Sequence, residues 1–487
     1  MLEPALSPDT MKDDLNLLTT PLQALIKRQP ITLAPTASIR AAAELMRAQR
    51  VSSLMLVEQA QLLGLVTDSD LRNRVVAQGL DIERPVSEIA TLSPMTVDAD
   101  SPAFEAVLLM TRHNIHHVPV MSGQHIVGML TATDLTAQRS TSAVFLAKDI
   151  YKQTTLEGLV QISQRIKCLQ QHLAAASASA YSTGHIITAM TDAFTKQLIQ
   201  LAEDQLGPAP IDYVWVAAGS QARHEQTAKT DQDNGLILDD SFDEAAHGAY
   251  FRAFSRFVCD GLDACGYVHC PGDMMAMTDT WRQPRQRWAD YFKQWIHTPE
   301  QKALMLTCVF FDLRVIHGQT ALIDTLRHDV LQQTKDNSLF LAYMVSNALK
   351  HRPPIGLFGR LVTQRGGDYA GSIDLKHSGI VPLVDLARVY ALAGGITAAN
   401  TADRLAQASD AGEVSAQGAH DLRDAFEFLA KLRITHQALQ ISRGEAPNNF
   451  LALKELSNFE RSHLKNAFTV VKTMQNVLGQ RYQSGRF

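Results

Sequence analysis

Residues 219–225 of this chain read Gly-Ser-Gln-Ala-Arg-His-Glu, and Asp-Gln-Asp follows at residues 231–233. An apolar run at 213–218 precedes this stretch, and a second one follows at 235–238. This order predicts a strand, a Gly-Ser turn, and two acids at the entrance to a second strand. Alternation along a strand points the two acids the same way, where their oxygens can hold a divalent cation. Because glycine lets a backbone approach phosphate closely, the stretch is typical of a metal-dependent triphosphate site.

The same residues resemble the signature of the polymerase beta-type nucleotidyltransferases. The family pattern is Gly-Gly/Ser-x-x-Arg-x-Glu followed by Ser/Thr-Asp-x-Asp, and the chain matches each element. Within that superfamily it is most similar to the PII-protein uridylyltransferase branch and to relatives fused to CBS domains. The resemblance implies phosphate contacts from Gly219, Ser220, Arg223 and Glu225, and Mg²⁺ or Mn²⁺ bound by Asp231 and Asp233. Arg223 has two readings: it stabilises phosphate charge, or it fixes Glu225 and the turn.

A third acid is expected on a later strand in this family, both as metal ligand and as catalytic residue. Asp312 is the candidate, because it follows the apolar run 304–311, which is suited to a buried strand. The alternatives for Asp312 are a cap at a strand end or an ion pair with Arg314.

Length and composition exclude several classes of protein. The chain has 487 residues, 46% of them hydrophobic, with a net charge of −5. About three soluble domains are expected from this length. The negative net charge does not indicate nucleic-acid binding, for which a basic domain is expected. No apolar run is long enough for a bilayer, and the N-terminus does not read as a signal peptide, so we expect a cytoplasmic protein.

The five cysteines form no Cys-x-x-Cys pair, which favours reduced thiols. Cys259, Cys265 and Cys270 are clustered, with His269 beside the last of them. Their spacing is not that of a metal site, and we interpret them as structural cysteines.

An internal repeat occupies the N-terminal part. The stretch Gly-Leu-Val-Thr at 64–67, followed by Asp70, returns as Gly-Met-Leu-Thr at 128–131, followed by Asp134. Each unit reads as short strands and amphipathic helices, and the pair resembles tandem CBS domains. The resemblance implies clefts for AMP, ADP, ATP or related adenosyl ligands, lined by Thr67, Asp70, Thr131 and Asp134. In the alternative, each threonine only caps the helix that follows it.

The remainder is mostly helical. Amphipathic segments are expected at 321–350, 383–395, 401–410, 416–443 and 457–482. The fold class is therefore α+β multidomain, with a tandem CBS pair, a small mixed-sheet nucleotidyltransferase domain and a C-terminal helical bundle. The expected divisions are an extension (1–25), the CBS pair (26–140), a helical connector (141–205), the nucleotidyltransferase domain (206–318) and a helical substrate-binding domain (319–487).

These features predict an enzyme that moves a nucleoside monophosphate from an NTP to an acceptor, under control of adenosine nucleotides. The resemblance implies a regulatory protein as acceptor, such as a PII-like regulator, with a small molecule as the alternative. A rival from another class is a non-catalytic adenosine-nucleotide sensor or scaffold. We expect a homodimer, because CBS pairs often dimerise.

Overall fold

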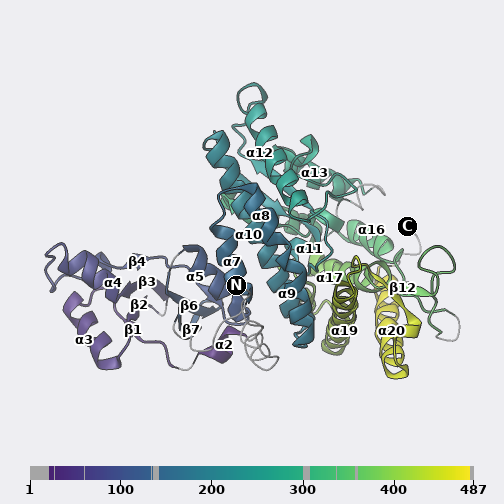
Figure 1. Cartoon of the computed structure of the whole chain (residues 1–487), viewed down its shortest axis with the longest axis horizontal. Coiled ribbons are helices and arrows are strands. Elements are labelled where there is room, and N and C mark those ends of the chain that lie inside the picture. Colours follow the sequence, from purple (N-terminus) through teal and green to yellow (C-terminus); the bar gives the residue numbers. More distant parts are fainter. Residues whose placement is uncertain are drawn as a thin grey trace. The chain divides into compact units, whose positions relative to one another are not determined.

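The structure is a computed structural model. It describes residues 21–26, 28–59, 61–113, 115–132, 134, 142–299, 306, 308–335, 337–356 and 360–482. Its contacts divide the chain into two compact units, residues 1–148 and 149–487. Many elements of both units are labelled in Figure 1.

The first unit contains two copies of one motif. Helix α3 (Ile39–Gln49), strand β2 (Ser53–Glu58) and strand β3 (Gln61–Thr67) recur 64 residues later as α5 (Ala103–His113), β6 (His117–Ser122) and β7 (His125–Thr131). Both antiparallel hairpins carry a bulge at the equivalent step, Leu56/Val57 and Val120/Met121. The structure therefore confirms the repeat that the sequence predicts.

Each copy builds its own small sheet and its own hydrophobic core. The strand orders are β1-β2-β3-β4 and β5-β6-β7. The other elements of this part are α2 (Leu22–Leu25), β1 (Thr32–Leu33), α4 (Asp68–Asp70), η1 (Leu71–Val76), η2 (Val86–Glu88), β4 (Thr91–Leu92) and β5 (Val97–Asp98), and α7 (Ser142–Tyr151) runs across the boundary between the units.

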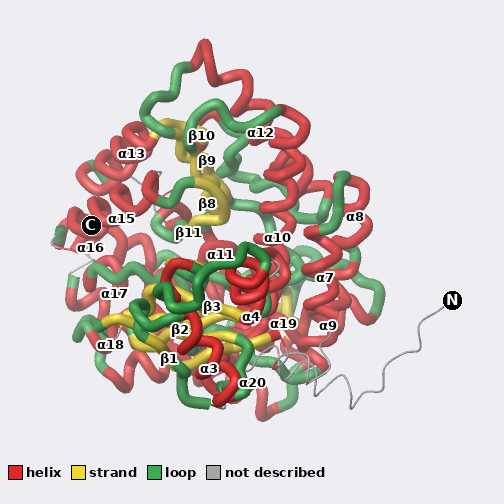
Figure 2. Tube along the Cα trace, turned by 90° about the vertical axis from the view of Figure 1, so that its left-hand side faces the viewer, coloured by secondary structure: helices red, strands yellow, loops and turns green. Residues whose placement is uncertain are grey.

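The second unit is centred on a mixed four-stranded sheet of order β10-β9-β8-β11, whose strands lie side by side in Figure 2. Strand β9 (Asn234–Leu238) is parallel to β10 (Arg282–Pro284) and antiparallel to β8 (Tyr213–Ala217), which is antiparallel to β11 (Arg314–Gly318). Every residue of β8 and β9 is buried. Such continuous burial is the mark of a sheet covered on both faces.

The two faces of β8 pack against different helices, as its alternation requires. Tyr213 and Trp215 contact the phenylalanines of α12 (Glu244–Ala264). Val214 and Val216 belong instead to a core with residues of α13 (Arg285–His297) and α15 (Ala321–Lys335). The long helix α10 (Ala180–Leu206) packs against α12, and α8 (Leu156–Ser163) and α9 (Arg165–Ala175) precede it.

The C-terminal part is helical, as expected. Its helices are α16 (Ser338–Ala348), α17 (Val381–Gly394), α18 (Thr401–Asp410), α19 (Ala416–Ser442) and α20 (Asn458–Arg481). Its shorter elements are β12 (Ser372–Asp374), η5 (Lys376–Ile380), β13 (Phe450–Ala452) and η6 (Leu453–Glu455). Two further short elements, α11 (Gly219–Ala222) and η3 (Asp279–Trp281), lie earlier in the unit. One continuous hydrophobic core runs from Val214 in the sheet to Leu478 in α20. The sheet and the helices are therefore packed as one body, and the α+β fold class is confirmed.

The strand expected over residues 304–311 is wrong. Leu306 and residues 308–310 are helical, and the strand begins later, at Arg314. The apolar run is explained by aromatic packing: the ring centroid of Phe310 lies 4.3 Å from that of Trp281, and Phe311 contacts Phe292. A short apolar run fits a buried helix as well as a buried strand, so its composition did not decide between them.

Candidate active site

The Gly-Ser turn begins where β8 ends. Gly219 has a φ of +56°, a backbone conformation that glycine adopts without strain. A Cβ atom at this position would lie 2.6 Å from Oδ2 of Asp233. The backbone of the turn therefore lies directly against one of the two acids, and a larger side chain has no room there.

The two acids lie in the extended segment that leads into β9. The backbone N–H of Ala218 donates to the carbonyl of Asp233 over 2.8 Å, which joins the acids to the end of β8. Ligand atoms of Asp231, Asp233 and Cys270 all lie within 4.8 Å of one another. The structure thus brings the predicted acid pair together and adds a thiol beside it.

The electrostatics of this group suit a cation. Oδ1 of Asp233 is buried and has no hydrogen-bond partner among the described residues. Burial, together with the nearby carboxylate of Asp231, raises the pKa of Asp233 to about 6. Burial and Asp233 likewise raise the pKa of Cys270 to about 11. A divalent cation would offset this repulsion and satisfy the unpartnered oxygen, so the residues present fit a metal ion.

The acids open into a pocket of about 200 Å³. One wall comes from the motif and contains Gly219, Ser220, Arg223, Glu225, Asp231 and Asp233. The other wall comes from the helical part, and both walls supply cations: Arg223, Lys229, Lys376, Arg388 and Arg433. Nζ of Lys376 lies 3.8 Å from Oδ1 of Asp231. Carboxylates and several cations in one pocket suit a metal-bound polyphosphate.

Asp312 lies in a different environment from the one expected. Its side chain is fully buried, and it is not among the residues that line the pocket. Arg223 and Arg388 each donate to its Oδ2 over 2.6 Å, and Arg404 donates to its Oδ1 over 2.5 Å. Burial alone would raise the pKa of Asp312, but the three guanidinium groups hold it well below its usual range. Both oxygens are thus occupied by arginines, and Arg314, the alternative partner from the sequence, pairs with Asp192 instead.

The arginines of this cluster connect the motif to the helices. Arg223 also donates to Glu225 over 2.7 Å, and Glu225 accepts from the backbone N–H of Thr401 at the start of α18. The side chain of Asn400 donates to the backbone carbonyl of Arg223 over 2.8 Å. Arg223 and Glu225 therefore fix the turn against α18, which is one of the two roles that the sequence left open for Arg223.

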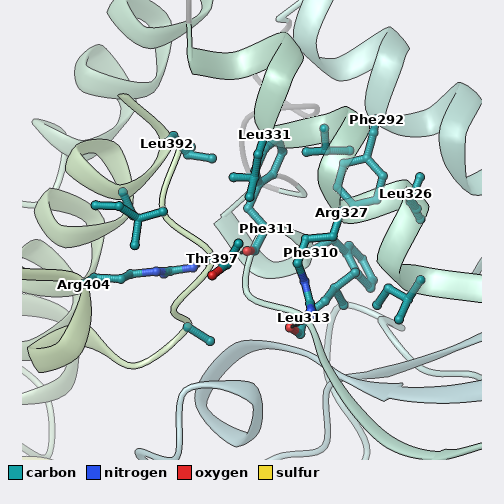
Figure 3. A pocket seen from close by; sticks show the side chains of 15 residues that line it. Phe292, Phe310, Phe311, Leu313, Leu326, Arg327, Leu331, Leu392, Thr397 and Arg404 are labelled. Carbon is teal, nitrogen blue, oxygen red and sulfur yellow. Dashed lines mark hydrogen bonds between the residues drawn. The ribbon is translucent and has the colours of Figure 1, made fainter. Parts of the chain in front are cut away.

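A second, apolar cavity of about 50 Å³ lies near this cluster. Figure 3 shows Phe310, Phe311 and Leu326 around it, with Arg404 reaching toward it from the opposite side. Its two arginines are engaged: Arg404 binds Asp312, and Arg327 donates to the carbonyl of Leu313. No carboxylate is among the residues that line this cavity, so it lacks the ligands that a divalent cation needs.

Three cationic residues of the pocket, Lys229, Arg388 and Arg433, were missed from the sequence. Arg388 lies in an apolar helix, three residues after Asp385, and donates to the carboxylate of Asp385 over 2.6 Å. Two opposite charges at this spacing in an apolar helix could have indicated a buried ion pair from the sequence. Burial lowers the pKa of Arg433 to about 10. No local motif marks Arg433, because its contacts with Thr227 and Asn449 come from other segments.

In the first unit, the two Thr-Asp pairs form equivalent capping boxes. The hydroxyls of Thr67 and Thr131 donate to the carboxylates of Asp70 and Asp134 over 2.7 and 2.6 Å. Thr131 and Asp134 also line a cleft of about 360 Å³ together with residues of the first repeat, including Arg50 and Ser53. Thr67 thus caps α4, Thr131 makes the equivalent hydrogen bonds with Asp134, and this second pair faces a cleft built from the two repeats.

Comparisons with known proteins identify the family of the chain. Three family profiles match: "CBS domain" at residues 22–77 and 86–140, "Putative nucleotidyltransferase DUF294" at 164–302, and "Putative nucleotidyltransferase substrate binding domain" at 338–482. Together they define a nucleotidyltransferase with a companion substrate-binding domain and a regulatory CBS pair. The chain belongs to the CBS-domain-containing nucleotidyltransferases of this family.

Individual relatives match the N-terminal repeat. CBS domain-containing protein YhcV of Bacillus subtilis is 34% identical over 107 residues, which are 22% of this chain and 76% of YhcV. CBS domain-containing protein CBSCBSPB1 of Arabidopsis thaliana is 31% identical over 133 residues, and the match spans only 24% of that protein. A solved CBS domain protein from Pyrobaculum aerophilum, complexed with AMP, is 34% identical; the match covers 26% of this chain and 98% of that one, with a TM-score of 0.24. None of the described helices is long and apolar enough to cross a membrane.

The buried cluster generates a stability prediction. Replacing Asp312 with Asn should lower the free energy of unfolding by about 3–5 kcal/mol, because three buried arginines lose their shared counter-charge. Urea denaturation monitored by tryptophan fluorescence measures this change. Asp290→Asn, at an exposed position of α13, is the control and should stay within about 0.5 kcal/mol. An unchanged midpoint in Asp312→Asn would contradict the role of the cluster.

Proposed function

We propose that this protein transfers a nucleoside monophosphate from a nucleoside triphosphate to an acceptor, with Mg²⁺ or Mn²⁺ held by Asp231 and Asp233. One observation carries the proposal: Asp233 has a buried oxygen without a partner among the described residues, and it lies close to Asp231 at a pocket that the Gly-Ser turn and several cations also line. When bound, the metal ion would neutralise phosphate charge and lower the pKa of an acceptor hydroxyl.

The residues of the turn position the nucleotide. Gly219 and Ser220 line the pocket, where the open backbone and the hydroxyl can contact the phosphates. Lys376 lies beside Asp231 and Lys229 is exposed at the pocket, so both can offset the charge of the departing pyrophosphate. Arg223 and Glu225 hold the turn, and Asp312 acts through Arg223 as a positioning residue.

The acceptor enters from the helical wall of the pocket. That wall contains Lys376 at the start of η5, Arg388 on α17 and Arg433 on α19, within the segment that matches a substrate-binding domain. By resemblance to the uridylyltransferase branch, we propose a PII-like regulatory protein as acceptor and UTP or ATP as donor. A small-molecule acceptor is the second possibility, and the cationic wall would then favour an anionic one.

The CBS pair supplies regulation. In the cleft of the first unit, the carboxylate of Asp134 can accept hydrogen bonds from ribose hydroxyls, and Arg28 and Arg50 can balance phosphate charge. We propose that AMP, ADP or ATP binds there and changes the rate of transfer, which requires different affinities for two states of the protein. We also propose that the chain forms a homodimer, which sedimentation equilibrium would establish.

Transfer should depend on the acid pair. Asp233→Asn should lower the rate at least about 10²-fold, since a catalytic metal ion supplies several kcal/mol to the transition state. The assay incubates the protein with labelled UTP or ATP, Mg²⁺ and cell extract, and follows label in protein and in metabolites. Asp290→Asn is the matched control. Because Asp233→Asn removes a buried charge beside Asp231, it should be no less stable in EDTA, so lost activity would not reflect unfolding.

Absence of any labelled product from the unaltered chain, or equal labelling by Asp233→Asn, would reject the enzyme in favour of a sensor or scaffold. Label in a metabolite rather than in a protein would select the small-molecule acceptor.

The cleft should bind adenosine nucleotides through Asp134. Asp134→Ala should weaken AMP binding roughly 10- to 100-fold, because a hydrogen bond to a charged group contributes about 1.5–3 kcal/mol. Calorimetry with AMP, ADP and ATP measures this affinity. Asp134→Asn keeps an oxygen that accepts from Thr131 and separates loss of that internal contact from loss of the carboxylate charge. Equal binding heats in all three proteins would exclude this cleft.

A further inference from the structure

Cys270 lies beside the acid pair, with its Sγ within 4.8 Å of ligand oxygens of both Asp231 and Asp233. We propose that Cys270 is a third protein ligand of the metal ion, and that the site therefore binds thiophilic divalent cations such as Zn²⁺, Co²⁺ and Cd²⁺ more tightly than an all-oxygen site would. This proposal rests on the proposed function in one respect: both assume a metal ion at Asp231 and Asp233.

The backbone places Cys270 there in a defined way. Residue 231 forms a parallel bridge with Val268, and the N–H of Gln232 donates to the carbonyl of Val268 over 3.0 Å. Further along, the N–H of Asn234 donates to the carbonyl of Met274 over 3.1 Å. The loop that contains Cys270 is thus joined to the acid-bearing segment on both sides of the thiol.

The side chain of Gln232 adds a second attachment. It points away from the acids and donates to the carbonyls of Cys259 and Tyr267, each over 3.0 Å. The loop is therefore fixed at its start as well, close to the thiol. A ligand held by a fixed backbone loses little conformational freedom when it binds a metal ion.

An independent observation points to a ligand at this place. Oδ1 of Asp233 is buried without a partner among the described residues, while the thiol of Cys270 lies within 4.8 Å of a ligand oxygen of the same carboxylate. When a cation binds, the sulfur forms the bond to the metal and its proton leaves to solvent. The cation thereby replaces the thiol proton beside Asp233 and supplies the partner that Oδ1 lacks.

The donor set determines the preference among metals. Mg²⁺ takes oxygen ligands in near-ideal octahedral geometry, whereas a thiolate is a soft ligand that suits zinc and its neighbours. Two carboxylates and one thiolate form a mixed set, which still accepts Mg²⁺ through oxygen. The presence of Cys270 should raise the affinity for thiophilic cations and leave that for Mg²⁺ nearly unchanged.

The other cysteines provide controls. Cys265 is buried like Cys270 but does not belong to the metal-binding group among the described residues. Cys168 is exposed and would bind added metal without specificity, so the experiment uses the full chain with Cys168→Ser throughout.

Titration with Co²⁺ tests the proposal without any activity assay. A thiolate-to-cobalt charge-transfer band should appear in the near ultraviolet, persist in Cys265→Ser and vanish in Cys270→Ser. Calorimetry should show that Cys270→Ser lowers the affinity for Cd²⁺ more than about tenfold. Loss of a group that only supports a metal ligand already costs about this much, and loss of a direct ligand should cost more. Mg²⁺ affinity should change far less.

Two results would overturn the proposal: a charge-transfer band that survives in Cys270→Ser, or Co²⁺ binding that needs Asp233 but gives no such band. The second result would indicate an oxygen-only site and leave the proposed transferase intact. Transfer that fails while the band behaves as expected would instead reject the proposed function and keep the metal ligand.

Discussion

The carboxylate of Asp312 is the group on which the second unit depends. It binds three arginines that come from separate segments: Arg223 after the Gly-Ser turn, Arg388 on α17 and Arg404 on α18. Burying a guanidinium group is costly unless a carboxylate neutralises it at short range. All three arginines are satisfied only when the turn and both helices meet at one place, so a single buried anion specifies how the motif and the helices fit together.

The position of the metal ligands follows from that cluster. Arg223 holds Glu225, and Glu225 is held in turn by the backbone at the start of α18. The turn that these contacts fix begins at Gly219, whose backbone lies against Asp233. The buried carboxylate of Asp312, which does not itself line the pocket, therefore sets the geometry of the acids through the arginines that do. Such support allows the acids to remain close together despite their mutual repulsion.

Local features of the structure could be predicted from the sequence, and contacts between distant segments could not. The constant spacing of 64 residues predicted the tandem repeat, and alternation predicted that Asp231 and Asp233 point together, which their distance in the structure matches. The partners of Asp312 lie 76 to 92 residues away, so no periodicity or motif indicates them. Cys270 reaches the acids because the chain returns past residue 231 after the long helix α12. The spacing of Cys270 from the other cysteines therefore does not predict that it lies near the acids.

The buried cluster also limits how transfer can be regulated. Both walls of the pocket belong to one compact unit in which a hydrophobic core joins the sheet to the C-terminal helices, and Arg223 and Arg388 contribute to both the pocket and the cluster. Opening the pocket by moving α17 away from the turn would separate Asp312 from its arginines, at a cost of about 3–5 kcal/mol. An allosteric effector typically supplies about 1–3 kcal/mol. Regulation by a nucleotide is therefore more consistent with small shifts of Lys229, which is exposed, and Lys376, which is partly exposed, than with separation of the pocket walls.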